Sequence, residues 1–163
     1  MSKNEIGIFS GEEEKKPSEE QLKKKPSLLM VEDDIDIKTL LRGFFEEDGW
    51  DVTAVRSGEE AIAELAKNEF EVMTCDIGLS GEKTGFDVID EVKYRIDRPA
   101  VLVVSSGVYI SLGVFFKKIE SEEAKETGID YFVDKPFDYI NLLTTVKQAQ
   151  VERLERLNNG HKK

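Results

Sequence analysis

The stretch Glu71-Val72-Met73-Thr74-Cys75-Asp76-Ile77-Gly78 decides how the rest of the chain is interpreted. Residues 72–75 are mostly apolar and favour a β-strand, and a continuous apolar run is typical of a strand buried in a parallel sheet. The run ends at the carboxylate of Asp76, and a glycine-rich loop follows. Functional groups collect beyond the carboxyl ends of strands in open α/β sheets. Asp76 is therefore a candidate functional residue, with a turn-capping aspartate as the ordinary alternative.

Four more buried strands are predicted, at residues 27–31, 50–55, 100–104 and 129–133. Apolar residues at helical spacing follow each strand, and Asp34, Ser57 and Asp138 stand where helix N-caps are expected. Residues 108–127 are predicted to form a loop or short turn and then a helix that ends at Gly128. Five strands that alternate with five helices indicate a doubly wound α/β fold around a parallel sheet.

Composition excludes several classes of function. The 163 residues carry a formal net charge of −11, which argues against non-specific nucleic-acid binding and against anionic membrane surfaces. No apolar run is long enough to cross a bilayer, and residues 1–5 lack the apolar core of a signal peptide. With Cys75 as the one cysteine, neither a disulfide framework nor a cysteine-rich metal site is expected. The single histidine, His161, lies in a polar tail. We therefore expect a cytoplasmic protein without a histidine-centred catalytic triad.

The chain divides into three parts by composition. Residues 1–26 are polar and dense in charge, which predicts a flexible arm. Residues 27–147 hold the alternating strands and helices. Residues 148–163 are predicted to be a helical extension and a polar tail, where a frayed or solvated helix is as good an interpretation as one that pairs with another chain. We expect no output domain and no helix-turn-helix.

Chemically compatible groups follow four different strands. Glu32 and Asp33 follow the first strand, Asp76 ends the third, Ser105 follows the fourth and Lys135 follows the fifth. Clustered carboxylates need a cation, and hard oxygen ligands suit Mg²⁺. A carboxylate can also accept a phosphoryl group, provided that a metal ion and a lysine neutralise the phosphoryl oxygens. Singly, each residue could be a helix cap, a loop charge or a hydroxyl that satisfies the backbone. Together, at one predicted sheet edge, they favour a common site.

At this point the chain from about residue 27 to residue 146 resembles the receiver domain of two-component response regulators. The resemblance rests on four motifs: Leu28-Leu29-Met30-Val31-Glu32-Asp33-Asp34, Cys75-Asp76-Ile77-Gly78-Leu79, Val101-Leu102-Val103-Val104-Ser105-Ser106, and Gly128-Ile129-Asp130-Tyr131-Phe132-Val133-Asp134-Lys135-Pro136-Phe137. It implies a flavodoxin-like three-layer sandwich with a five-stranded parallel sheet of order 2-1-3-4-5. It also implies a cis peptide bond between Lys135 and Pro136.

The resemblance implies a role for each site residue. Asp76 would be the phosphoacceptor, phosphorylated by a histidine kinase or a histidine phosphotransfer protein. Mg²⁺ would be bound directly by Asp33, through water by Glu32, and by Asp76 and the Gly78 carbonyl. The set is completed by the Ser105 hydroxyl and the Lys135 ammonium as phosphate-binding groups, and by Phe132 as the switch aromatic.

The implied function is that of a stand-alone receiver that signals to an unknown downstream protein by protein–protein contact. It would not be an enzyme beyond self-phosphorylation and autodephosphorylation. One alternative is a module of the same fold that is never phosphorylated and acts by dimerisation, for which the long segment 108–127 is the best support. A second is a phosphatase of the haloacid dehalogenase type, suggested by Asp34-Ile35-Asp36. Lys38 does not fit that motif.

Overall fold

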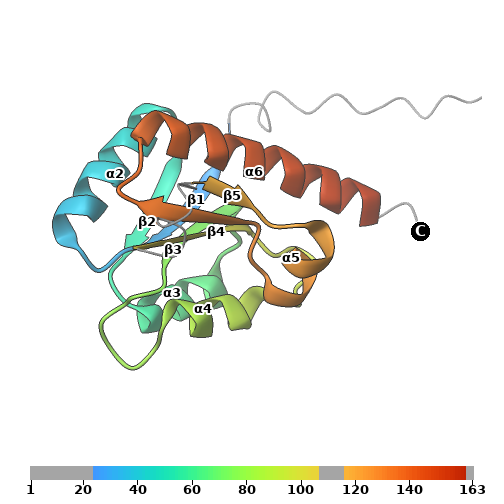
Figure 1. Cartoon of the computed structure of the whole chain (residues 1–163), viewed down its shortest axis with the longest axis horizontal. Coiled ribbons are helices and arrows are strands. Elements are labelled where there is room, and N and C mark those ends of the chain that lie inside the picture. Colours follow the sequence, from blue (N-terminus) through green and yellow to red (C-terminus); the bar gives the residue numbers. More distant parts are fainter. Residues whose placement is uncertain (1–23, 107–115, 161–163) are drawn as a thin grey trace, which may run out of the picture.

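The computed structural model describes residues 24–106 and 116–160 (Figure 1). Most of the predicted N-terminal arm, the first part of the 108–127 segment, and the tail with His161 lie outside these residues. Five strands form the parallel part of the sheet: β1 (Ser27–Val31), β2 (Asp51–Val55), β3 (Val72–Asp76), β4 (Ala100–Ser106) and β6 (Tyr131–Lys135). Their order is β2-β1-β3-β4-β6, which confirms the predicted order 2-1-3-4-5.

A sixth strand extends the sheet, and the sequence did not predict it. β5 (Phe116–Lys118) pairs antiparallel with β6 at the edge of the sheet. The segment predicted as a loop and a helix therefore contributes a short strand before α5 (Ser121–Thr127). The end of that helix is as predicted, because Gly128 adopts a left-handed φ of 75° at its C-cap.

Helices cover both faces of the sheet (Figure 1). α2 (Ile35–Glu47) and α6 (Tyr139–Gly160) pack on one face, while α3 (Gly58–Lys67), α4 (Gly85–Val92) and α5 cover the other. The predicted N-caps are confirmed, since the side chains of Asp34, Ser57 and Asp138 each accept a hydrogen bond from a backbone amide of the helix that follows. None of the described helices combines the length and the apolar composition that a bilayer span needs.

The helix after β6 has the helical extension that the sequence predicts. α6 continues without a break to Gly160. Its second half is not a solvated helix, because Arg153 is only 7% exposed and donates hydrogen bonds to the backbone carbonyls of Asp97 and Arg98. One side of residues 148–160 is therefore packed against the body of the fold, while Val151 and Leu154 on the other side are exposed.

Candidate functional site

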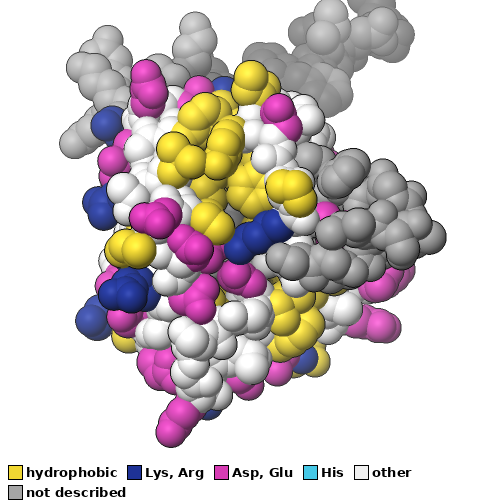
Figure 2. Space-filling model, turned by 60° about the vertical axis from the view of Figure 1, so that its left-hand side comes forward, with side chains coloured by type: hydrophobic (Ala, Val, Ile, Leu, Met, Phe, Trp, Pro, Cys, Tyr) yellow, Lys and Arg dark blue, Asp and Glu magenta, His cyan; other side chains and the backbone are white. Residues whose placement is uncertain are grey.

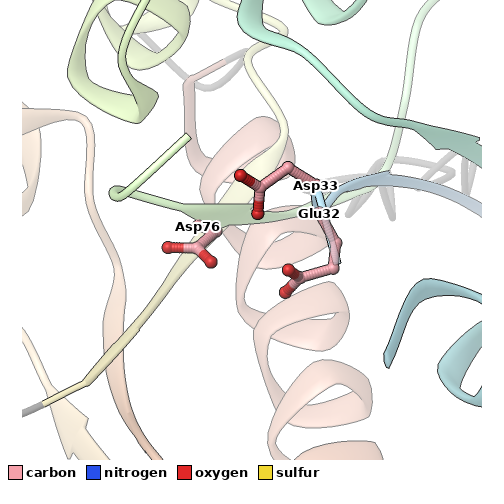
Figure 3. Close-up of side chains that lie close together, drawn as sticks. All are labelled: Glu32, Asp33 and Asp76. Carbon is pink, nitrogen blue, oxygen red and sulfur yellow. The ribbon is translucent and has the colours of Figure 1, made fainter. Parts of the chain in front are cut away.

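The register of the parallel strands brings the predicted acidic residues together. Val31 of β1 lies opposite Cys75 of β3, so the residues that follow each of them emerge side by side at the carboxyl edge of the sheet. Carboxylate oxygens of Glu32, Asp33 and Asp76 lie within 4.8 Å of one another. Figure 3 shows that the side chains of Asp33 and Asp76 face the same small volume, with Glu32 beside them.

Lys135 is the cation of this site. It ends β6, and its Nζ lies 2.9 Å from Oδ2 of Asp76 and 3.0 Å from Oε2 of Glu32. The lysine side chain is 18% exposed and that of Asp76 is 13% exposed. Partial burial strengthens these charge-assisted contacts relative to a surface ion pair. Lys135 therefore lies beside the carboxylates, as its place at the end of a neighbouring strand predicts.

Backbone amides of the loops after β1 and β3 orient the carboxylates further. The Gly78 amide donates to Oδ1 of Asp76 at 2.8 Å, and the Ser80 amide donates to Oδ2 of Asp33 at 3.1 Å. The Asp34 amide donates to Oε1 of Glu32 at 3.1 Å. The contribution of Ser80 was not predictable from the sequence, because a backbone amide can donate a hydrogen bond from any loop residue except proline.

The electrostatics of the site differ from residue to residue. Burial raises the pKa of Glu32 above its ordinary value, and the charge of Asp76 adds to this, while Lys135 and the Asp34 amide oppose it. Burial also acts to raise the pKa of Asp33, but hydrogen bonds from Ser80 outweigh it and hold that pKa below its ordinary value. Burial would lower the pKa of Lys135, but hydrogen bonds to Asp76 and Glu32 outweigh this and raise it. The lysine therefore stays charged at neutral pH.

The two remaining predicted residues lie nearby on neighbouring strands. Val104 pairs with Asp76 in the register, which puts Ser105 one position further along β4 at the same edge. Ser105 is half-buried, and it lies opposite Asp134 of β6. Phe132 of β6 is half-buried and packs against the core on the face that carries α3, α4 and α5. The Lys135–Pro136 peptide bond is cis, as predicted.

The donor set fits a hard divalent cation. Three carboxylates supply oxygen ligands only, and Mg²⁺ commonly takes one or two carboxylates and completes its shell with water and phosphate oxygens. Asp33 and Asp76 are half-buried rather than sealed, so water and a substrate can reach them. Glu32 is 4% exposed and is engaged by Lys135, which agrees with a role one water molecule away from the ion.

The structure does not support a phosphatase site at Asp34 and Asp36 or a nucleophilic role for Cys75. Asp34 caps α2, and Asp36 lies in the first turn of that helix with its amide bonded to Asp34, so this pair does not form a phosphatase site. Cys75 is fully buried, and burial raises the pKa of its thiol to about 12. Such a thiol is not a nucleophile at neutral pH.

Gly85 fixes the backbone at Asp76 and provides a test of how tightly the site is built. A Cβ at position 85 would collide with the carbonyl oxygen of Asp76 and would lie 2.8 Å from Cα of Ile77. Gly85→Ala should therefore lower the free energy of unfolding by about 1–3 kcal/mol, because the backbone under Asp76 must shift. The matched control is Gly43→Ala, in the exposed middle of α2, where a Cβ meets nothing within 4 Å. That change should instead stabilise the protein by roughly 0.5–1 kcal/mol. Urea unfolding of both variants measures the difference, and equal effects would contradict the packing argument.

Comparison with known proteins agrees with this geometry. Residues 28–147 match the family model of the response regulator receiver domain. The chain belongs to the response-regulator receiver family. The response regulator SaeR of Staphylococcus aureus is 32% identical over 139 residues, which cover 80% of this chain and 56% of the relative. The chain thus spans about half the length of the curated relatives it matches.

Solved receiver structures have the same fold. A CheY-like receiver domain protein from Methanospirillum hungatei JF-1 superposes with a TM-score of 0.66 at 21% identity, over 81% of this chain and 98% of that one. The chemotaxis response regulator CheY4 of Vibrio cholerae superposes with a TM-score of 0.62 at 22% identity, over 77% of this chain and 99% of that one. The predicted flavodoxin-like sandwich is confirmed. Receivers are phosphoacceptors of two-component signalling, and they interact with histidine kinases or phosphotransfer proteins rather than acting as classical enzymes.

Proposed function

We propose that Asp76 accepts a phosphoryl group in a Mg²⁺-dependent step and that the receiver then signals through protein–protein contacts. The observation that supports this most is the convergence of Glu32, Asp33 and Asp76 within 4.8 Å, with Lys135 in contact with two of them. An acidic cluster suits a divalent cation, and a lysine at the acceptor suits a phosphoryl oxygen.

Each residue would have a distinct part in the transfer. One carboxylate oxygen of Asp76 attacks phosphorus, and the bond from phosphorus to the donor's histidine nitrogen breaks, so that the electron pair of that bond stays on the imidazole. Asp33, Asp76 and the Gly78 carbonyl would hold Mg²⁺ directly and Glu32 would hold it through water. The ion would neutralise charge on the phosphoryl oxygens.

Lys135 would move from its pair with Asp76 to a phosphoryl oxygen, since its Nζ already lies 2.9 Å from the acceptor carboxylate. Ser105, at the same edge of the sheet, would donate its hydroxyl to a second phosphoryl oxygen. Phe132 would change its packing in response, because phosphorylation adds charge and acceptor oxygens that bias a two-state element.

A protein donor needs a surface beside the site. Figure 2 shows hydrophobic side chains gathered next to a group of acidic and basic ones. At the start of α2, Ile35 is 51% exposed, and at the start of α6, Ile140 is 69% exposed. The ring of Tyr139 joins α6 to α2 through its contact with Phe44, and it also contacts Phe137, just before α6. Exposed apolar groups next to reactive polar ones are typical of interaction sites, so we propose that the histidine kinase or phosphotransfer protein docks here.

The test is the intact mass of the protein after incubation with Mg²⁺ and acetyl phosphate. The wild-type chain should gain one phosphoryl mass, and the gain should disappear without Mg²⁺ and in Asp76→Asn, which keeps the shape of the side chain but removes the nucleophilic carboxylate. The matched control is Asp36→Asn, an exposed residue in the first turn of α2, which should take up phosphoryl normally. If the wild-type chain takes up nothing although Mg²⁺ binds, the proposal fails and the unphosphorylated interaction module replaces it.

A further inference from the structure

A cavity lies at the end of the sheet opposite Asp76. It has a volume of about 560 Å³ and is lined by residues of α5, by the second half of α6, and by Ala100 and Asp130, which lie at the amino ends of β4 and β6. Small-molecule sites are commonly about 300–1,000 Å³ in volume. The phosphoryl-transfer site contributes no residue to it, so its function is separate from the one proposed above.

Three arginines converge on this cavity around a single carboxylate. Arg98 is 5% exposed, and its guanidinium makes two hydrogen bonds to Asp130, of 2.8 and 3.0 Å. Arg153 is 7% exposed and is held by the uncharged carbonyls of Asp97 and Arg98. Arg156 donates to the Arg98 carbonyl, and its Nη1 lies 3.6 Å from Asp130. Buried charges are usually paired, yet here two guanidiniums share one carboxylate and the third is held by backbone carbonyls.

The wall of the cavity carries an excess of positive charge. Its basic residues are Arg98, Lys118, Lys125, Arg153 and Arg156. Its acidic residues are Asp130, Glu152 and Glu155. The lining residues thus carry two more positive charges than negative ones, in a protein whose net charge is −11, and one of these cations, Lys125, also pairs with Glu122 just outside the cavity. The excess is therefore a local feature of this cavity and not a general property of the surface.

Part of the guanidinium hydrogen-bonding capacity is unused. Within residues 24–106 and 116–160, Nε of Arg156 is buried and has no hydrogen-bond partner. Burial, together with the nearby charges of Arg98 and Arg153, lowers the pKa of Arg156 to about 10. An anion in the cavity would relieve this mutual repulsion and would supply acceptors.

We propose that this cavity binds a small organic dianion of the phosphate-monoester or dicarboxylate type. Guanidinium groups recognise both kinds of oxyanion through paired N–H donors, and two negative charges match the excess on the wall. Lys125 contributes from α5 and Arg156 from α6, so the ligand joins these two helices. Its binding would stabilise the position of the α6 extension over β5.

The test uses the full chain in buffer freed of divalent cations with a chelating resin, so that no cation draws a phosphate to Asp76 and no soluble polycarboxylate chelator competes for the cavity. Isothermal titration calorimetry with phenyl phosphate and with succinate should give saturable one-site binding for at least one of them, and the dianion that binds identifies the class. Benzyl alcohol, the uncharged control, should not bind. Backbone amide shifts in ¹⁵N spectra should fall within residues 119–125 and 149–160. Shifts confined to residues 76–80 and 135, or no saturation with either dianion, would overturn the proposal.

A lysine variant separates binding from folding. The Lys125 side chain is 70% exposed and pairs with Glu122, one turn away on α5, so Lys125→Gln should leave the unfolding temperature unchanged. It should weaken dianion binding about tenfold, the loss expected for one charge-assisted hydrogen bond. Lys67→Gln, an exposed lysine on α3 outside the cavity, should bind as the wild type does. If both lysine variants bind equally well, the cavity is not the site.

Discussion

Replacement of Lys135 by methionine should slow phosphoryl uptake from acetyl phosphate by about two orders of magnitude or more, the loss typical of removing one preorganised charge-stabilising group. Methionine keeps the apolar stem of the side chain and removes the ammonium group that contacts Asp76 at 2.9 Å and Glu32 at 3.0 Å. In the wild type this ammonium contacts the proposed acceptor carboxylate directly. The rate is measured as the gain of phosphoryl mass with time at saturating Mg²⁺.

The same variant should respond more strongly to Mg²⁺ than the wild type. Without Lys135 the buried carboxylate of Glu32 and the half-buried carboxylates of Asp33 and Asp76 have lost the cation between them, so they repel one another. The variant should therefore have a lower unfolding temperature in EDTA and regain much of the loss when Mg²⁺ is added. Binding of an ion to the folded state alone stabilises it in proportion to its affinity there. This recovery shows that slow uptake is not a consequence of misfolding.

Lys147→Met is the matched control for both measurements. Lys147 is a lysine on α6 whose side chain is 54% exposed and pairs with Asp48 at the surface. Its loss should change stability by less than about 1 kcal/mol and should leave uptake unchanged. Wild-type uptake by Lys135→Met would show that the lysine has no part in the transfer.

How much of the molecule the sequence predicts depends on the range over which each signal acts. The strands and the helix caps at Asp34 and Ser57 are determined by short segments of sequence, so hydrophobic periodicity and residue type are enough to predict them. The acidic cluster could also be predicted, because the ends of parallel strands meet at one edge. The order of the strands in the sheet was predicted from the family resemblance and not from the residue pattern.

Features without a local pattern were not predictable. β5 has three residues, Phe116-Lys117-Lys118, and forms only because β6 offers it an antiparallel partner. The capping box of Thr84 and Asp87 was not predicted, because Thr84 lies in the glycine-rich loop that follows Asp76. The docking of the α6 extension depends on Arg153 and Arg98, which are 55 residues apart in the chain. From the sequence alone, Arg153 and Arg156 resemble the solvated face of a charged helix, whereas in the structure both donate to backbone carbonyls of residues 97 and 98.

Asp130→Asn should lower the free energy of unfolding by about 3 kcal/mol or more, the lower part of the range for breaking a buried ion pair. The asparagine side chain would keep the size of the aspartate and could still accept a hydrogen bond from the Val101 amide, which donates to Oδ2 of Asp130 at 2.8 Å. It would leave the guanidinium of Arg98, whose side chain is 6% exposed, without a counter-charge. Urea unfolding measures the loss. The control is Asp90→Asn, an exposed i,i+3 partner of Lys93, which should cost less than about 1 kcal/mol.

The double variant Arg98→Met with Asp130→Asn decides what the loss means. If the single variant is unstable because it buries an unpaired charge, removal of that charge should restore part of the stability. The double variant should then be more stable than the sum of the two single losses predicts, with a coupling of about 1–3 kcal/mol. Additive losses of unfolding free energy would contradict this interpretation. Asp130 would then stabilise the protein through its hydrogen bond with the Val101 amide. Since the Arg98 carbonyl also receives Arg153 and Arg156, a coupled result would further mean that one ion pair fixes both the start of β4 and the extension of α6.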